Sequence, residues 1–401
     1  MRLSTAQLYA STTASITARQ SDLATIQNQL STGKRIASLA DDPAGAAQAS
    51  SLRSTLSANG QFEKNRQFAT ERLSFTESIL GAVGENLQTV RETMVAAGNS
   101  PLTDTDRKIL AGKLRESLGS LVSLGNTANG EGGFLFGGFR ESAPPFASNG
   151  LTVSYNADDG NRSVNVTQTR AMPIGVNGAS VFMRITNGNG VFAAAANAAN
   201  SGNALIDAGS TTNPALLTGN NYEIRFQTGG SGMTYDVLDV TAGTTVSSGT
   251  PYTAPAAIAM PGLTVRIDGA PANGDRFTVA PSINQSLYAI VGNAITALET
   301  PTNGNTGKIG NAVRSALTDL DQAITHVSNN RAVTGARMNE LDQLGQVGTA
   351  RNVDLQSTLA SIEDIDYAKA ISEFSVRQNG LQAALSTYSR IAGRSLFDYL
   401  R

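Results

Sequence analysis

The sequence contains no cysteine, no tryptophan and a single histidine, His326, among 401 residues. Without cysteine the chain can form no disulfide, thiolate metal site, iron–sulfur cluster or cysteine nucleophile. One histidine supplies neither a histidine metal cluster nor a Ser/His/Asp triad, so we interpret His326 as a surface or seam residue of a helix. These absences exclude the common catalytic and metal-binding arrangements, and we expect no catalytic residue, metal or cofactor.

Charge of either sign is also sparse. Lysine and arginine number 30 against 32 acidic residues, without a long run of one sign, so nucleic acid is not an expected partner. No stretch approaches the run of about 20 apolar residues that a membrane span needs, and the first residues lack the apolar core of a cleaved signal peptide. We therefore expect no membrane insertion and, for export, a route without a cleaved signal.

Both ends of the chain carry narrow apolar stripes with coiled-coil spacing. The C-terminal ladders, counted in sevens, are Ile371, Gln378 and Leu385, and Phe374, Leu381 and Tyr388. The N-terminal ladder is Tyr9, Ile16, Leu23 and Leu30, with Ile26 on the companion position. A helix with one apolar stripe needs a partner in water, so the spacing predicts that the two ends pair as antiparallel helices.

Local signals place further helices between these ends. Asp42 is a natural N-cap before Pro43, and Thr103 with Asp106 forms a capping-box pattern. Helices are predicted from Pro43 to about Gly98, from Thr103 onward, over 283–300, and again from Lys308. No proline follows Pro301, so the C-terminal helix is free to continue a much longer one upstream, with a bend or loose patch at Gly345, Gly348 and Asn352.

The middle of the chain lacks the helical spacing of the two ends. Short alternating runs at 151–155, 222–226, 263–267 and 276–279 lie between turn residues and predict antiparallel strands. Residues 193–199 and 210–217 are interpreted as short helix or loop. Asp158-Asp159-Gly160 is interpreted as a β-turn, because it lacks the alternating ligands and distant glutamate of a calcium loop.

These segments predict an α+β protein: a long antiparallel α-helical coiled-coil stalk formed by both chain ends, with a β-rich globular head inserted mid-chain. We expect a terminal coiled-coil assembly domain (1–40 with 363–401), a helical rod domain (41–135 with 283–362) and a β-rich outer head domain (136–282). The narrow apolar stripes at the two ends enclose little core by themselves, which favours self-assembly with copies of the chain.

The ends also match a known family. MRLSTAQLYASTTASI, LSTGKRIASLADDPAGAAQA and the ending IDYAKAISEFSVRQNGLQAALSTYSRIAGRSLFDYLR resemble the bacterial flagellin superfamily. Asp41-Asp42-Pro43, the GFLFGG segment at 133–138 with Pro145-Phe146, and SLFDYL at 395–400 are most similar to its hook-filament junction members. The resemblance covers residues 1–146 and roughly the last 120 residues.

This resemblance implies a structural component of the bacterial flagellum, located outside the cell at the hook-filament junction and not an enzyme. It implies a place between hook-associated protein 1 and the flagellin filament, export unfolded through the flagellar type III apparatus without a cleaved signal peptide, and an export chaperone on the C-terminal helix. The expected assembly residues are Tyr9, Ile16, Leu23, Ile26, Leu30, Ile371, Phe374, Leu381, Leu385, Tyr388, Leu396 and Phe397.

Alternatives remain open at this point. The nearest is a filament flagellin, which differs in copy number. An enzyme in the 151–281 insertion would depend on carboxylates such as Asp158, Asp159, Glu223 and Asp236, and a secreted coiled-coil adhesin would form a stable oligomer alone. Replacing Leu381 and Leu385 with charged residues is expected to abolish assembly, and the polar Gln378 is interpreted as a weakening of the seam that helps release from the chaperone.

Overall fold

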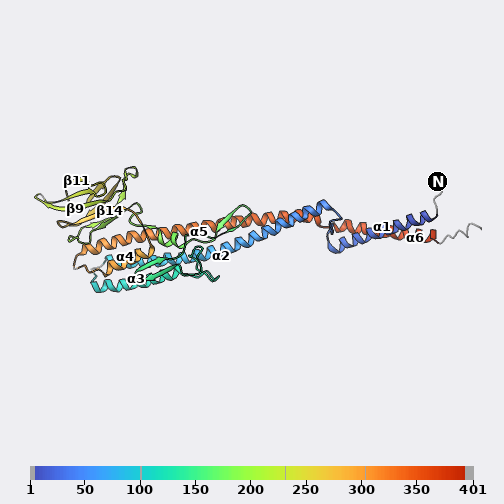
Figure 1. Cartoon of the computed structure of the whole chain (residues 1–401), viewed down its shortest axis with the longest axis horizontal. Coiled ribbons are helices and arrows are strands. Elements are labelled where there is room, and N and C mark those ends of the chain that lie inside the picture. Colours follow the sequence, from blue (N-terminus) through green and yellow to red (C-terminus); the bar gives the residue numbers. More distant parts are fainter. Residues whose placement is uncertain (1–4, 100–101, 231, 303, 393–401) are drawn as a thin grey trace, which may run out of the picture. The chain divides into compact units, whose positions relative to one another are not determined.

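The computed structural model describes residues 5–99, 102–230, 232–302 and 304–392 (Figure 1). The helices are α1 (Thr5–Thr32), α2 (Pro43–Asn99), α3 (Asp104–Gly125), α4 (Leu287–Glu299), α5 (Thr306–Glu363) and α6 (Tyr367–Ala392). The first strands are β1 (Phe146–Asn149), β2 (Thr152–Tyr155), β3 (Ser163–Asn165), β4 (Ala171–Pro173), β5 (Ile185–Thr186), β6 (Phe192–Ala196), β7 (Leu205–Ile206) and β8 (Ser210–Thr211). They are followed by β9 (Tyr222–Gly229), β10 (Gly232–Asp239), β11 (Thr244–Pro251), β12 (Ala256–Met260), β13 (Leu263–Asp268), β14 (Arg276–Pro281) and β15 (Asn284–Gln285). Helical ends around an antiparallel β-rich middle confirm the predicted α+β class.

The chain divides into two compact units. The terminal unit comprises Met1–Lys64 and Gln343–Arg401, and the central unit comprises Asn65–Asp342. The long helices α2 and α5 each contribute residues to both units.

Two helix boundaries in the terminal unit have local causes, and the predicted start of α2 at Pro43 is confirmed. α1 is followed by Gly33, whose φ of 71° is a left-handed conformation that glycine adopts without strain. α2 starts at Pro43, and Oδ1 of Asp42 accepts a hydrogen bond from the Gly45 N–H at 2.9 Å. Asp42 therefore caps the helix as its position before proline predicts.

The helical core of the central unit is formed by one face of α2 against α3, α4 and the first half of α5. Leu73, Leu80, Leu87 and Met94 are spaced seven apart on α2 and are fully buried. The capping box at the start of α3 is present in both directions, with the Asp106 N–H donating to Thr103 Oγ1 at 3.2 Å and the Thr103 N–H donating to Asp106 Oδ2 at 3.0 Å. The predicted capping box is confirmed.

The glycine and aromatic segment after α3 supplies rings to this helical core. Phe146 lies 5.1 Å from Tyr288 and 5.2 Å from Phe182, measured between ring centroids. Phe136 packs edge-on against Phe182. The segment thus joins the start of the β region to α4 through ring contacts.

The β region has a second core between two antiparallel sheets. One is five-stranded in the order β11-β10-β9-β14-β6, and the other has the order β12-β13-β7 with β8 also paired to β13. Alternate residues of β9 and β13 are buried, including Ile224, Phe226, Val265 and Ile267. The strands predicted at 151–155, 222–226, 263–267 and 276–279 are confirmed as β2, β9, β13 and β14.

The predictions for residues 193–199 and for a continuous C-terminal helix are wrong, and the prediction of short helix or loop for residues 210–217 is correct only in part. Residues 193–199 contain strand β6, because pairing with β14 overrides the helical propensity of alanine. Residues 210–217 divide into β8 and the 3-10 turn η2 (Pro214–Leu216). The C-terminal helix is not continuous, since α5 ends at Glu363 and α6 begins at Tyr367, whereas α5 stays helical across Gly345, Gly348 and Asn352.

Candidate assembly surface

The terminal unit pairs α1 with α6 in antiparallel orientation, as predicted. The rings of Tyr9 and Tyr388 meet edge to face with centroids 6.3 Å apart, near the beginning of α1 and the end of α6. Further along, Nη1 of Arg377 lies 3.7 Å from Oδ2 of Asp22. The inner face of the pair, the face that each helix turns to the other, contains Tyr9, Ile16, Leu23, Ile26 and Leu30 on α1 and Ala370, Phe374, Arg377, Leu381, Ala384 and Tyr388 on α6.

Few side chains of this inner face are fully buried. Only Ile26 and Ala370 are fully buried among the described side chains of α1 and α6, with exposures of 3% and 5%. The remaining inner-face residues are half-buried. A pair of helices with so little enclosed apolar surface is weakly stabilised on its own.

Two predicted residues of the C-terminal seam face outward. Ile371 is 55% exposed and Leu385 is 43% exposed, and Gln378 between them is exposed as well. The ladder that faces α1 is shifted by one position, to Ala370, Arg377 and Ala384. Sequence reasoning missed it because small and charged residues occupy the covered positions while the larger apolar residues stand beside them.

The outward residues form a continuous outer stripe of Tyr367, Ile371, Gln378 and Leu385. Their separations of four and seven residues are close to whole helical turns, so they lie on one face of α6. Tyr367 is 53% exposed. The apolar stripe of α6 is therefore wider than α1 covers, and Gln378 belongs to the uncovered part. Leu396 and Phe397 lie outside the described residues.

The connections between these helices meet at a buried carboxylate that sequence reasoning missed. Glu363 is 2% exposed and accepts ion pairs from Lys34 Nζ and Arg53 Nη2, each at 2.5 Å. Its backbone carbonyl accepts the Arg35 N–H at 2.6 Å, and the Ile365 N–H donates to the Gly33 carbonyl at 3.0 Å. We call this arrangement the Glu363 clamp. It holds the α1–α2 connection against the α5–α6 connection.

The charge state of the clamp follows from competing effects. Burial alone raises the pKa of Glu363, but the hydrogen bonds and charges of Lys34 and Arg53 outweigh it and hold the pKa below its usual value. Glu363 is therefore ionised near neutral pH. The basic residues after α1 were visible in the sequence, but their partner lies 329 residues away along the chain.

The candidate residues for chemistry are hydrogen-bonded or ion-paired within the chain. Asp158 Oδ1 accepts the N–H groups of Phe139 and Gly160, and the second bond closes an Asx turn in the segment predicted to be a β-turn. Asp159, Glu223 and Asp236 are bound by neighbouring residues, namely Arg184, Arg225 with Arg276, and Gln227 with Ser248. Nε2 of His326 lies 2.7 Å from the Ser180 carbonyl.

Neither of two further site classes is found in the described ranges. They contain no group of three or more His, Cys, Asp or Glu residues arranged to hold a metal ion. None of the described helices combines the length and the apolar character that a membrane crossing requires.

Comparison with known proteins places this geometry in a family. Residues 3–141 match the model of the bacterial flagellin N-terminal helical region, and residues 317–400 match that of the C-terminal helical region. The crystal structure of FlgL from Xanthomonas campestris is 31% identical over 77% of this chain and 98% of its own, with a TM-score of 0.68. The chain belongs to the flagellar hook-associated protein 3 (FlgL) family.

Full-length relatives agree with this placement. Flagellar hook-associated protein 3 of Salmonella typhimurium is 26% identical over the whole of both chains. The crystal structure of flagellar hook-associated protein 3 from Legionella pneumophila aligns with 78% of this chain and 98% of its own length. The two are 27% identical, with a TM-score of 0.73. Phase 1 flagellin of Salmonella naestved, in contrast, matches only 40% of this chain. The chain is a structural component of the bacterial flagellum, and its hook-associated protein 3 relatives are structural proteins.

Proposed function

We propose that this protein is the adaptor between hook-associated protein 1 and the flagellin filament at the hook-filament junction. The observation that carries the proposal is the outer stripe on α6, an apolar surface that α1 leaves open beside a weakly covered inner face. Full-length similarity to hook-associated protein 3 favours the junction over the filament, because the flagellin match leaves most of the chain unaligned.

In this proposal the terminal helices have successive partners. An export chaperone covers the C-terminal helix before export, which proceeds without a cleaved signal peptide. After export, copies of the chain pack the inner face and the outer stripe beside those of their neighbours and of hook-associated protein 1 and flagellin. The proposed assembly domain is 1–40 with 363–401, the rod is 41–135 with 283–362, and the head is 136–282.

The inner face and the outer stripe have to be tested separately. Leu381 lies on the inner face and Leu385 on the outer stripe, so charging both at once mixes loss of helix pairing with loss of assembly. The cleaner variant is Ile371→Glu with Leu385→Glu. Its matched control is Ser372→Glu with Ser386→Glu, which places two charges at the same spacing on exposed positions rotated by about 100°.

We expect a strain without the gene to be non-motile and to shed full-length flagellin from intact hooks. The control variant should restore swimming, whereas the outer-stripe variant should not, because two carboxylates in an apolar contact between subunits are costly. Immunoblotting of the medium separates failed assembly from failed export. Normal motility of the outer-stripe variant would exclude the stripe from assembly, and filaments that persist without the protein would contradict the junction role.

A further inference from the structure

The central unit contains a cavity of about 510 Å³ that the assembly function does not use. It lies between strand β6, the end of α4 and the first turns of α5, where Figure 1 shows the sheet next to the start of α5. Its floor is the alanine run of β6, Ala193 to Ala196. The volume is in the range of sites that hold a drug-sized molecule or an equally small part of a larger partner.

Strand β6 is an edge of the five-stranded sheet and pairs only with β14 there. Next to the paired segment, the Asn197 N–H donates to Arg276 and the Ser282 N–H donates to Val191, each at 3.0 Å. Since hydrogen-bonding positions alternate along an antiparallel strand, the odd-numbered residues of β6 bond to β14. The backbone N–H and C=O groups of Ala194 and Ala196 therefore point to the free edge, where no described group pairs with them.

The cavity also presents unused polar side chains. Lys308 and Arg314 line it from α5 and form no ion pair with any described residue. Its two carboxylates are held by backbone N–H groups and not by these cations: Asp207 accepts the N–H groups of Gly209 and Arg266, and Asp319 accepts that of Gly188. Nε2 of Gln285 is enclosed and donates to no described acceptor. The two cations and the unpaired amide of Gln285 would be satisfied by a ligand that has negative charge and hydrogen-bond acceptors.

We propose that this cavity binds an extended peptide that adds as a strand to the free edge of β6. Main-chain hydrogen bonds to Ala194 and Ala196 hold the peptide, and alternate aliphatic side chains fill the space over the alanine floor. An acidic residue of the peptide, or its terminal carboxylate, pairs with Lys308 and Arg314. A chain with this pattern of aliphatic and acidic residues is the partner that fits the site.

The test uses purified full-length protein and a displayed library of random heptapeptides, followed by calorimetric titration of the enriched synthetic peptides. Ala194→Pro removes an N–H that faces the free edge and leaves the ladder to β14 intact. We expect it to weaken binding about tenfold, the loss of roughly one hydrogen bond. Lys308→Ala with Arg314→Ala should weaken it about fivefold or more, and more so at low salt.

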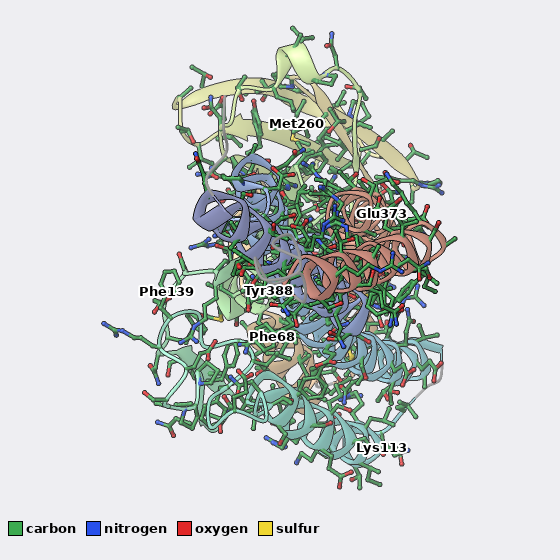
Figure 2. The ribbon with its side chains drawn as sticks, turned by 90° about the vertical axis from the view of Figure 1, so that its right-hand side faces the viewer. Phe68, Lys113, Phe139, Met260, Glu373 and Tyr388 are labelled. Atoms are coloured by element: carbon green, nitrogen blue, oxygen red, sulfur yellow. The ribbon has the colours of Figure 1, made fainter. Side chains whose placement is uncertain are left out.

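Lys113→Ala is the matched control, because Lys113 on α3 is exposed and is not among the residues that line the cavity. Figure 2 shows Lys113 at the opposite end of the view from Met260 in the β-sheet region. It should leave peptide affinity unchanged, and equal melting curves would show that all variants fold. Peptides that bind the Ala194→Pro protein as tightly as the parent, or a library that yields no binder, would overturn the proposal. So would a concentration-dependent dimer that Ala194→Pro abolishes, since it would assign the free edge to a second copy.

Discussion

Glu363 shows how one side chain can hold two chain connections together. Its pKa lies below the ordinary value of 4.5, because ion pairs with Lys34 and Arg53 overcome the cost of burial. A carboxyl group with a lowered folded-state pKa stabilises the fold above its unfolded pKa, and that contribution is lost as the pH falls through the folded pKa. The clamp should therefore weaken in acid below about pH 4.5 and stay intact at neutral pH.

Glu363→Gln tests this at pH 7. It keeps the shape of the side chain but removes the charge that two cations need, so the terminal unit should lose about 2 kcal/mol of stability. The chain has no tryptophan, so Phe374→Trp on the inner face gives a single fluorescent reporter of the α1–α6 pair. The difference between parent and variant should shrink as the pH falls below 4.5.

The control for this experiment is Glu340→Gln. Glu340 forms an exposed ion pair with Arg170 in the central unit, and such pairs contribute little. It should leave the reporter transition within about 0.5 kcal/mol of the parent. Equal stabilities of the Glu363→Gln variant and the parent would mean that the clamp contributes nothing to the pairing of the two ends.

At the scale of elements, α3 depends on its cap. Thr103→Ala removes both the side-chain acceptor for the Asp106 N–H and the hydroxyl that holds the Asp106 carboxylate. We expect thermal unfolding of the central unit, followed by circular dichroism, to show a loss of about 1 kcal/mol. Thr105→Ala, on the exposed first turn of the same helix, is the control and should be near neutral. Equal losses in both variants would contradict the capping role.

The elements also show which features a sequence can predict. The starts of α2 and α3 were predictable because Asp42-Pro43 and Thr103 with Asp106 act within one helical turn. Strand β6 was not, because its alanines favour helix and only pairing with β14 makes them a strand. The break after Glu363 contains neither proline nor glycine. It has a local signal in Asp366, whose Oδ1 accepts the Lys369 N–H at 3.1 Å at the start of α6, and it also makes contacts with Gly33 and Lys34 that the sequence does not reveal.

The candidate assembly surface on α1 and α6 was also predictable only in part. The antiparallel pairing of the ends followed from heptad spacing, and the ladder of Phe374, Leu381 and Tyr388 does lie toward α1. The second ladder was misplaced by one residue. A hydrophobic pattern identifies apolar residues but not which of two adjacent stripes a given partner covers, and α6 has both.

At the scale of the whole molecule, the two units differ in how much apolar surface they enclose. Full burial in α1 and α6 is confined to Ile26 and Ala370 among their described side chains, whereas α4 buries Leu287, Ile290 and Val291 completely or nearly so. Amide exchange reports the free energy of local opening, which depends on such contacts. We expect amides of α1 and α6 in the monomer to exchange at least a hundredfold faster than those of α4.

Hydrogen-exchange mass spectrometry on the monomer and on isolated filaments measures this difference. Because assembly is proposed to cover the inner face and the outer stripe, protection in α1 and α6 should rise sharply in the filament, while α4 and β13 serve as internal references that change little. The strain with the Ile371→Glu and Leu385→Glu variant should yield no filaments, so this variant should keep the fast exchange of the monomer. The Ser372→Glu and Ser386→Glu control should assemble and show the rise. Monomer amides of α1 and α6 as protected as those of α4 would show that the ends are stable before assembly, so that burial by neighbouring subunits could not be what orders them.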